Sequence, residues 1–109
     1  MKGTYLGEFE EIVLLIVGTL NGDAYGVSVK KKAQDQLNRS TTLSAVHTAL
    51  HRLEAKGFVR SEMGESTNVR GGKKKRLFKI TSDGSQALDR ARSVREELWQ
   101  EMQTITKLA

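Results

Sequence analysis

Two histidines four residues apart, His47 and His51, are the most chemically versatile pair in the sequence. On a helix they would share one flank with Glu54, and two imidazoles with a carboxylate can bind Zn²⁺ or Ni²⁺. The chain has no Cys and lacks the His-Glu-x-x-His motif, the Gly-x-Ser-x-Gly motif and a glycine-rich phosphate loop before a helix. We therefore expect no enzyme, no metal and no cofactor, and expect both histidines to contact DNA or phosphate or simply to lie on the surface.

The second notable feature is a cluster of basic residues: Arg70, Lys73, Lys74, Lys75, Arg76 and Lys79. No acidic residue lies between Glu65 and Asp83, and Gly71-Gly72 permits a tight loop beside the cluster. Lysines also discourage strand edges from pairing, but four consecutive cations exceed that need. The charge of residues 30–84 is +8 in a chain of net charge +5, which indicates a polyanionic partner.

The length of 109 residues and the balanced composition predict one globular domain. Without Cys the chain is no disulfide scaffold, which fits a reducing compartment. The longest apolar run, Ile12 to Val17, is too short to span a membrane, and acidic residues precede it where a signal peptide would be basic. We expect a cytoplasmic protein with no membrane partner.

Apolar residues at three- and four-residue spacing predict helices over residues 8–20, 24–37, 44–56 and 81–107. Ser44 is the expected N-cap of the third helix and Gly57 its C-terminal stop, while Thr81 caps the fourth. In the third helix, the expected buried stripe is Leu43, Val46, Leu50 and Leu53. The opposite face is polar and carries Ser44, Thr48, His51, Arg52 and Ala55.

Strand character over residues 58–65 and 76–81 predicts a hairpin around the basic loop. Three helices followed by such a hairpin form the winged helix-turn-helix arrangement, so the expected fold class is mainly α with a small β-hairpin. We expect a DNA-binding domain over residues 1–81 and a C-terminal dimerisation helix over 82–109, joined in one compact unit. The third helix would enter the major groove, and the hairpin, or wing, would contact the adjacent backbone or the minor groove.

The candidate DNA-contact residues come from the second and third helices and the wing: Tyr25, Thr41, Thr42, Ser44, His47, Thr48, His51, Arg52, Arg70, Lys73, Lys74, Lys75 and Arg76. For some of them a structural role stays open. Tyr25 can pack in the core with its hydroxyl exposed, Ser44 can serve as a cap, and Arg52 can pair with Glu54 or Asp35 instead of DNA.

The chain resembles the PadR family of bacterial transcriptional regulators over about residues 5–107. The resemblance rests on Leu6-Gly7-Glu8-Phe9-Glu10, Ala24-Tyr25-Gly26, the segment Leu43 to Glu54 with Lys56-Gly57, Gly71-Gly72 with the four cations that follow, and Phe78 to Thr81 with Gly84. It implies a homodimeric repressor that binds a palindromic operator, in the short-tailed branch with a single C-terminal helix. Members of the family commonly have Tyr at the position of His47. Histidine has a shorter side chain than tyrosine, and its charge depends on pH.

The fourth helix, roughly 39 Å long, should project beyond a compact core and be covered by a second copy of the chain. Its apolar stripe, together with the first helix that the resemblance adds, gives the expected dimer interface: Phe9, Ile12, Leu88, Ala91, Leu98, Met102 and Ile105. Trp99, beside that stripe, is either an interface anchor or an aromatic wall for a small planar effector, as the resemblance to multidrug-sensing members implies.

Two other functions remain open at this point. A sequence-nonspecific architectural DNA-binding protein would need the same basic wing, and a protein–protein adaptor would use the fourth helix alone. Charge reversal at residues 73–76 separates them, because an adaptor keeps its partner whereas a DNA-binding protein loses affinity and salt dependence.

Overall fold

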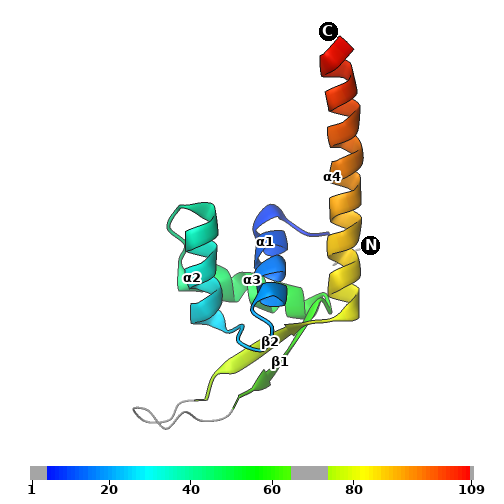
Figure 1. Cartoon of the computed structure of the whole chain (residues 1–109). Helices are drawn as coiled ribbons and strands as arrows, with labels where there is room; N and C mark the ends of the chain where they lie inside the picture. Colours follow the sequence, from blue (N-terminus) through cyan, green and yellow to red (C-terminus); the bar gives the residue numbers. More distant parts are fainter. Residues whose placement is uncertain (1–4, 65–73, 109) are drawn as a thin grey trace.

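The computed structural model describes residues 5–64 and 74–108 (Figure 1). Its elements follow the order helix, helix, helix, strand, strand, helix: α1 (Glu8–Thr19), α2 (Gly26–Leu37), α3 (Leu43–Ala55), β1 (Val59–Met63), β2 (Arg76–Ile80) and α4 (Ser82–Leu108). This is the winged helix-turn-helix order expected from the sequence. Residues 65–73 of the connection between the strands, which include Arg70 and Lys73, lie outside the described residues.

The core lies where the first three helices meet the base of the hairpin. Each helix turns its aliphatic residues inward, and the strands add Val59 and Phe78 to the same cluster. The largest fully buried side chains are Leu14, Leu50, Leu53, Val13, Val17, Val29 and Val46. Because α1 contributes to this core along most of its length, it is the central helix against which the others pack.

The hairpin is antiparallel, with Val59 opposite Ile80 and Met63 opposite Arg76. Phe78 fixes its position, because the Phe78 side chain is buried and the Phe78 N–H donates to the carbonyl oxygen of Ala24 at 2.8 Å. That bond ties β2 to the residue just before Tyr25, the N-cap of α2. The wing therefore has a defined position relative to the helix-turn-helix.

Helix α4 begins at a tight junction with the core. The Thr81 Oγ1 accepts the N–H of Gly84 at 3.0 Å, as expected of a cap, and donates to the carbonyl oxygen of Gly57 at 2.6 Å. A Cβ on Gly84 would lie 2.2 Å from the carbonyl oxygen of Phe58, so a glycine is required. Beyond Ala87 and Leu88 the helix leaves the core, and Figure 1 shows its C-terminal half projecting past α1.

Three local predictions need correction. The N-cap of α3 is Thr42, not Ser44: Thr42 is extended and its Oγ1 accepts the N–H of Ala45 at 3.0 Å, which leaves Ser44 inside the first turn. Leu43, at the first helical position, is exposed, so the buried stripe starts at Val46. Helix α2 starts at Gly26, two residues after the expected start, because the polypeptide is still extended at Tyr25.

Candidate nucleic-acid interface

The exposed face of α3 is the surface that the sequence assigns to DNA. Val46, Ala49, Leu50 and Leu53 are buried, and the opposite side is exposed at Ser44, His47, Thr48, His51, Arg52 and Ala55. The helix ends where Gly57 adopts a φ of +80°. A shallow polar helix face fixed by a buried stripe is suited to a groove of duplex DNA.

A hollow of about 340 Å³ adjoins this face, and we call it the α2–α3 hollow. Three elements line it: the start of α2, the middle of α3 and the start of β2. Its lining residues are Tyr25, Gly26, Val27, His47, His51, Lys75, Arg76 and Phe78. Five of these are predicted DNA-contact residues, from segments distant in the sequence, and the fold brings them around one concave surface.

Close packing between α2 and α3 forms the floor of the α2–α3 hollow. A Cβ on Gly26 would lie 2.7 Å from the His47 Cε1, so the absence of a side chain on Gly26 lets the imidazole sit against the start of α2. The rings of His47 and His51 have centroids 6.5 Å apart. The N-terminal N–H groups of α2 and two imidazoles thus lie near each other, a favourable setting for an anion.

Cations of the wing close the other side of the hollow. The Lys75 ammonium lies 4.2 Å from the centroid of the Tyr25 ring, a cation–π contact that holds its charge at the rim. The Arg76 Nη1 donates to the Ser61 Oγ at 3.0 Å, and that hydroxyl donates to the Glu54 Oε2 at 2.6 Å. Glu54 is therefore engaged on the wing.

The sequence offered Glu54 as the carboxylate that could bind a metal ion together with His47 and His51. Its hydrogen bond with Ser61 therefore bears on the metal hypothesis. Within residues 5–64 and 74–108, His, Asp and Glu side chains form no group of three or more that could hold a metal ion. The histidine pair instead belongs to the lining of the α2–α3 hollow.

Ion pairs on α1 hold the C-terminal end of α3. The Glu10 carboxylate lies 2.5 Å from the Lys56 ammonium and 3.8 Å from the Arg52 Nη1. Arg52 thus pairs with Glu10 rather than with Glu54 or Asp35, the two partners considered from the sequence. Its side chain remains 67% exposed, so the guanidinium is accessible from the α3 face.

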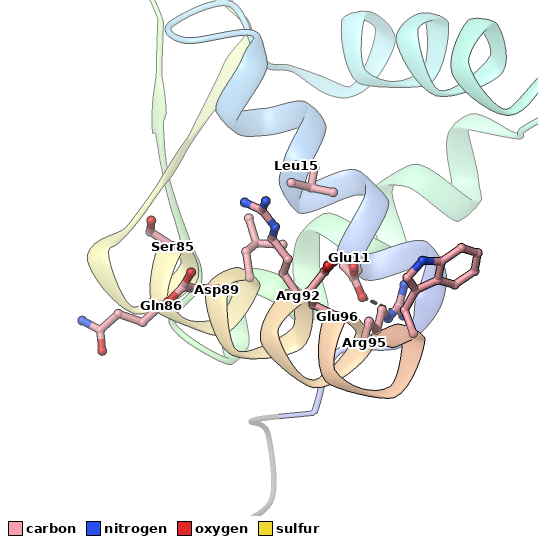
Figure 2. Close-up of a pocket in the computed structure, with 10 residues that line it drawn as sticks. Glu11, Leu15, Ser85, Gln86, Asp89, Arg92, Arg95 and Glu96 are labelled. Atoms are coloured by element: carbon pink, nitrogen blue, oxygen red, sulfur yellow. Dashed lines mark ion pairs between the residues drawn. The ribbon is translucent and has the colours of Figure 1, made fainter. Parts of the chain in front are cut away.

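On the other side of α1 lies a second hollow, of about 710 Å³, between α1 and α4. Figure 2 shows Glu11 and Leu15 of α1 opposite Arg92 and Arg95 of α4, with Glu11 and Arg95 paired. The Arg95 Nη2 lies 2.9 Å from the Glu11 Oε1. Leu88 and Trp99 complete the apolar part of this α1–α4 hollow.

The profile of the PadR-like family of transcriptional regulators matches residues 13–90, which is most of the chain. The chain belongs to this family. A PadR-like transcription factor from Bacteroides fragilis has a similar structure, with a TM-score of 0.74 at 21% identity over 89% of this chain and 88% of that one. A Streptococcus transcriptional regulator gives 0.69 at 19% identity over 90% and 91%.

A third similar structure is that of Bacillus subtilis PadR, which was solved in complex with operator DNA. It matches with a TM-score of 0.60 at 19% identity over 74% of this chain and 45% of that one. No curated protein sequence matched. At these identities the structural matches establish the PadR fold, and family membership establishes a transcriptional regulator, not an enzyme. No helix of the described residues is long and apolar enough to cross a membrane.

The predicted DNA-contact residues differ in their exposure to solvent. Lys74, Lys75 and Arg76 are exposed on the wing, and Thr42 is exposed at the start of α3. Thr41 is buried, and its N–H donates to the Gln34 Oε1 at 3.4 Å, so Thr41 lies apart from the exposed set.

The predicted dimer residues also fall into two groups in the PadR-like chain. Phe9, Ile12 and Leu88 are half-buried against the core, and Ala91 is also only partly exposed. Leu98, Met102 and Ile105 are exposed on α4. Leu15 of α1, which is not among the predicted interface residues, is also exposed. The signal for it was present, since α1 has more apolar residues than one buried face needs.

Proposed function

We propose that this PadR-like regulator binds operator DNA with α3 in the major groove and the wing against the neighbouring backbone. The observation that carries the proposal is the α2–α3 hollow, where five predicted contact residues from three elements surround one concave surface beside the exposed face of α3. The operator complex of Bacillus subtilis PadR, a protein with a similar fold, supports it.

In this proposal the exposed residues divide into two roles. Ser44, Thr48 and Arg52 face the base edges, where an arginine can bind guanine in bidentate geometry. The lining of the α2–α3 hollow binds a backbone phosphate through Tyr25, His47, His51, Lys75 and Arg76. Lys74 adds charge beside them, and Arg70 and Lys73 are proposed to continue the phosphate contacts. Thr41 has no part in this interface because it is buried.

The regulator is proposed to act in the cytoplasm as a homodimeric repressor. The exposed apolar side chains of α4, together with Leu15 of α1, form a surface that a second copy of the chain would cover. Two α3 helices related by a twofold axis would then read a palindromic operator whose half-sites lie roughly 34 Å apart.

A small planar aromatic effector is proposed for the α1–α4 hollow. Leu15 and Trp99 give it apolar walls, and the Glu11–Arg95 pair gives it polar groups. An effector that binds more tightly to a dimer with a different spacing of its two α3 helices would weaken operator binding. The size of this effect depends on the ratio of the effector's affinities for the two spacings.

Fluorescence anisotropy tests the DNA proposal directly. We expect DNA from the region upstream of the protein's own gene to bind at least about a thousandfold more tightly than a scrambled duplex, with a steep salt dependence. Lys75→Ala should lower the slope of log affinity against log salt by about 0.9, because one phosphate contact is lost. Lys107→Ala, at the exposed end of α4, is the matched control and should leave the slope unchanged.

The other outcomes separate the competing functions. Equal binding to both duplexes would favour the architectural protein, and equal slopes for the two lysine variants would remove Lys75 from the interface. No binding to either duplex at low salt would contradict DNA binding and leave the adaptor.

A further inference from the structure

Arg52 is the only arginine of α3, and it lies on the flank of the helix that faces α1. At 3.6 residues per turn, Ser44, Thr48 and Arg52 are each about 40° apart on the helix circumference, whereas His47 lies about 140° from Arg52. The α2–α3 hollow, which His47 lines, is therefore on one flank of α3, and the Arg52 guanidinium is on the other.

The carboxylate that faces Arg52 is held in place by a second cation. The Glu10 Oε1 lies 2.5 Å from the Lys56 ammonium, and the Glu10 Oε2 lies 3.8 Å from the Arg52 Nη1. The Glu10 and Lys56 side chains are only 12% and 17% exposed, which leaves the carboxylate little room to move. Because the Arg52 side chain is 67% exposed, a fixed buried anion here faces an accessible guanidinium.

The charge of Glu10 determines which part of DNA suits Arg52. A phosphate bound to Arg52 would bring its negative charge close to that of Glu10, and the two anions would repel each other. A guanine edge is uncharged and offers two acceptors, O6 and N7, which a guanidinium can bind in bidentate geometry. Since a guanidinium has five N–H donors, Nη1 can stay near Glu10 while other donors face the base. A carboxylate at this position thus favours contact with a base over contact with the backbone.

We propose that Glu10 is a positioning residue that directs Arg52 to a guanine and away from phosphates, and that it thereby raises the sequence specificity of the regulator. This inference rests on DNA binding by α3 in the proposed function and names the residue that sets its base preference. Glu10 itself does not touch DNA. Without its charge, Arg52 would bind phosphates of any sequence, so affinity for unrelated DNA would rise and the preference for the operator would fall.

Salt dependence separates a base contact from a phosphate contact, and the upstream and scrambled duplexes of the anisotropy assay serve as probes. Arg52→Ala should weaken binding to the upstream duplex by roughly fivefold or more, without changing the slope of log affinity against log salt on either duplex. Glu10→Gln keeps the shape of the side chain and should steepen the slope on the scrambled duplex by about 0.9, because Arg52 gains a phosphate contact. The preference for the upstream duplex should fall by roughly fivefold.

Glu8→Gln is the matched control, because it removes the same charge from the same turn of α1 at an exposed position. It should leave the slopes and the preference unchanged. In a protein that already carries Arg52→Ala, Glu10→Gln should no longer steepen the slope. A slope that steepens in that background, or equally in Glu8→Gln, would overturn the proposal, because the cation that gains the phosphate would not be Arg52. A shallower slope in Arg52→Ala alone would also overturn it, because Arg52 would then already bind a phosphate.

Two further results keep the test decisive. If Glu10→Gln does not fold by circular dichroism, Glu10→Gln/Lys56→Met replaces it and is compared with Lys56→Met, because this variant leaves no desolvated cation beside the amide. Unmodified protein that binds both duplexes equally, or neither of them, would contradict the proposed function itself. That result is obtained before any variant is compared, so failure of the proposed function is distinguishable from failure of the role of Glu10.

Discussion

Lys56→Met should destabilise the protein more than the same substitution at Lys79, the other lysine for which the structure shows an ion pair. The Lys56 ammonium donates to the Tyr5 carbonyl oxygen and lies 2.5 Å from the Glu10 carboxylate. The two side chains are only 17% and 12% exposed, so removal of Lys56 leaves Glu10 largely desolvated with Arg52 at 3.8 Å as its remaining partner. Breaking a fully buried pair costs about 3–5 kcal/mol. With the residual exposure and the remaining Arg52, we expect about 2 kcal/mol.

Lys79→Met is the matched control. Lys79 lies 3.8 Å from Glu62, and these side chains are 49% and 70% exposed, so its loss should cost at most about 0.5 kcal/mol. Urea denaturation at pH 7 measures both free energies of unfolding, with an unchanged m-value as the check that the denatured state is the same. The double variant Glu10→Gln/Lys56→Met should recover about 1 kcal/mol, because it no longer leaves a desolvated carboxylate. Equal losses for Lys56→Met and Lys79→Met would refute the reasoning.

Two further pairs of substitutions test the corrected local structure. Thr42→Ala should cost about 1 kcal/mol through loss of the α3 cap, whereas Ser44→Ala should stay within about 0.5 kcal/mol; the reverse order in urea denaturation would restore Ser44 as the cap. Gly84→Ala should cost at least about 2 kcal/mol, because its Cβ meets the Phe58 carbonyl oxygen. Gly18→Ala, with nothing within 4 Å of the added Cβ, should instead stabilise α1 by about 0.5 kcal/mol, and a thermal shift of the same sign for both variants would contradict this.

The order of elements was predictable from the sequence because each element has a local signal. The apolar spacing of α1 and α3 and the basic loop between two short strands are each contained in fewer than about 20 consecutive residues. The N-cap of α3 was harder to place. Thr42 and Ser44 are both good capping residues, and only the backbone conformation at Thr42 shows which hydroxyl reaches the N–H two or three positions later.

The contacts that the sequence did not reveal join residues far apart in the chain. Glu10 and Lys56 are 46 residues apart, and neither charge pattern nor periodicity links them. Arg52 was expected to pair with an acid nearby in sequence, but the packing of α1 against α3 brings Glu10 closer. The sequence also did not reveal that Leu15 is exposed, although its neighbours Val13, Leu14 and Ile16 are buried.

Two adjacent carboxylates on α1 connect the two surfaces of this regulator. Glu10 holds Arg52 and Lys56 of α3, and Glu11 holds Arg95 of α4. A shift of α4 relative to α1 therefore acts on the same helical turn that positions the end of α3. Because α1 is packed into the core along most of its length, it would transmit such a shift as a rigid body rather than by bending. The proposed effector hollow lies at the Glu11 end of this connection, where a ligand has the shortest structural path to α3.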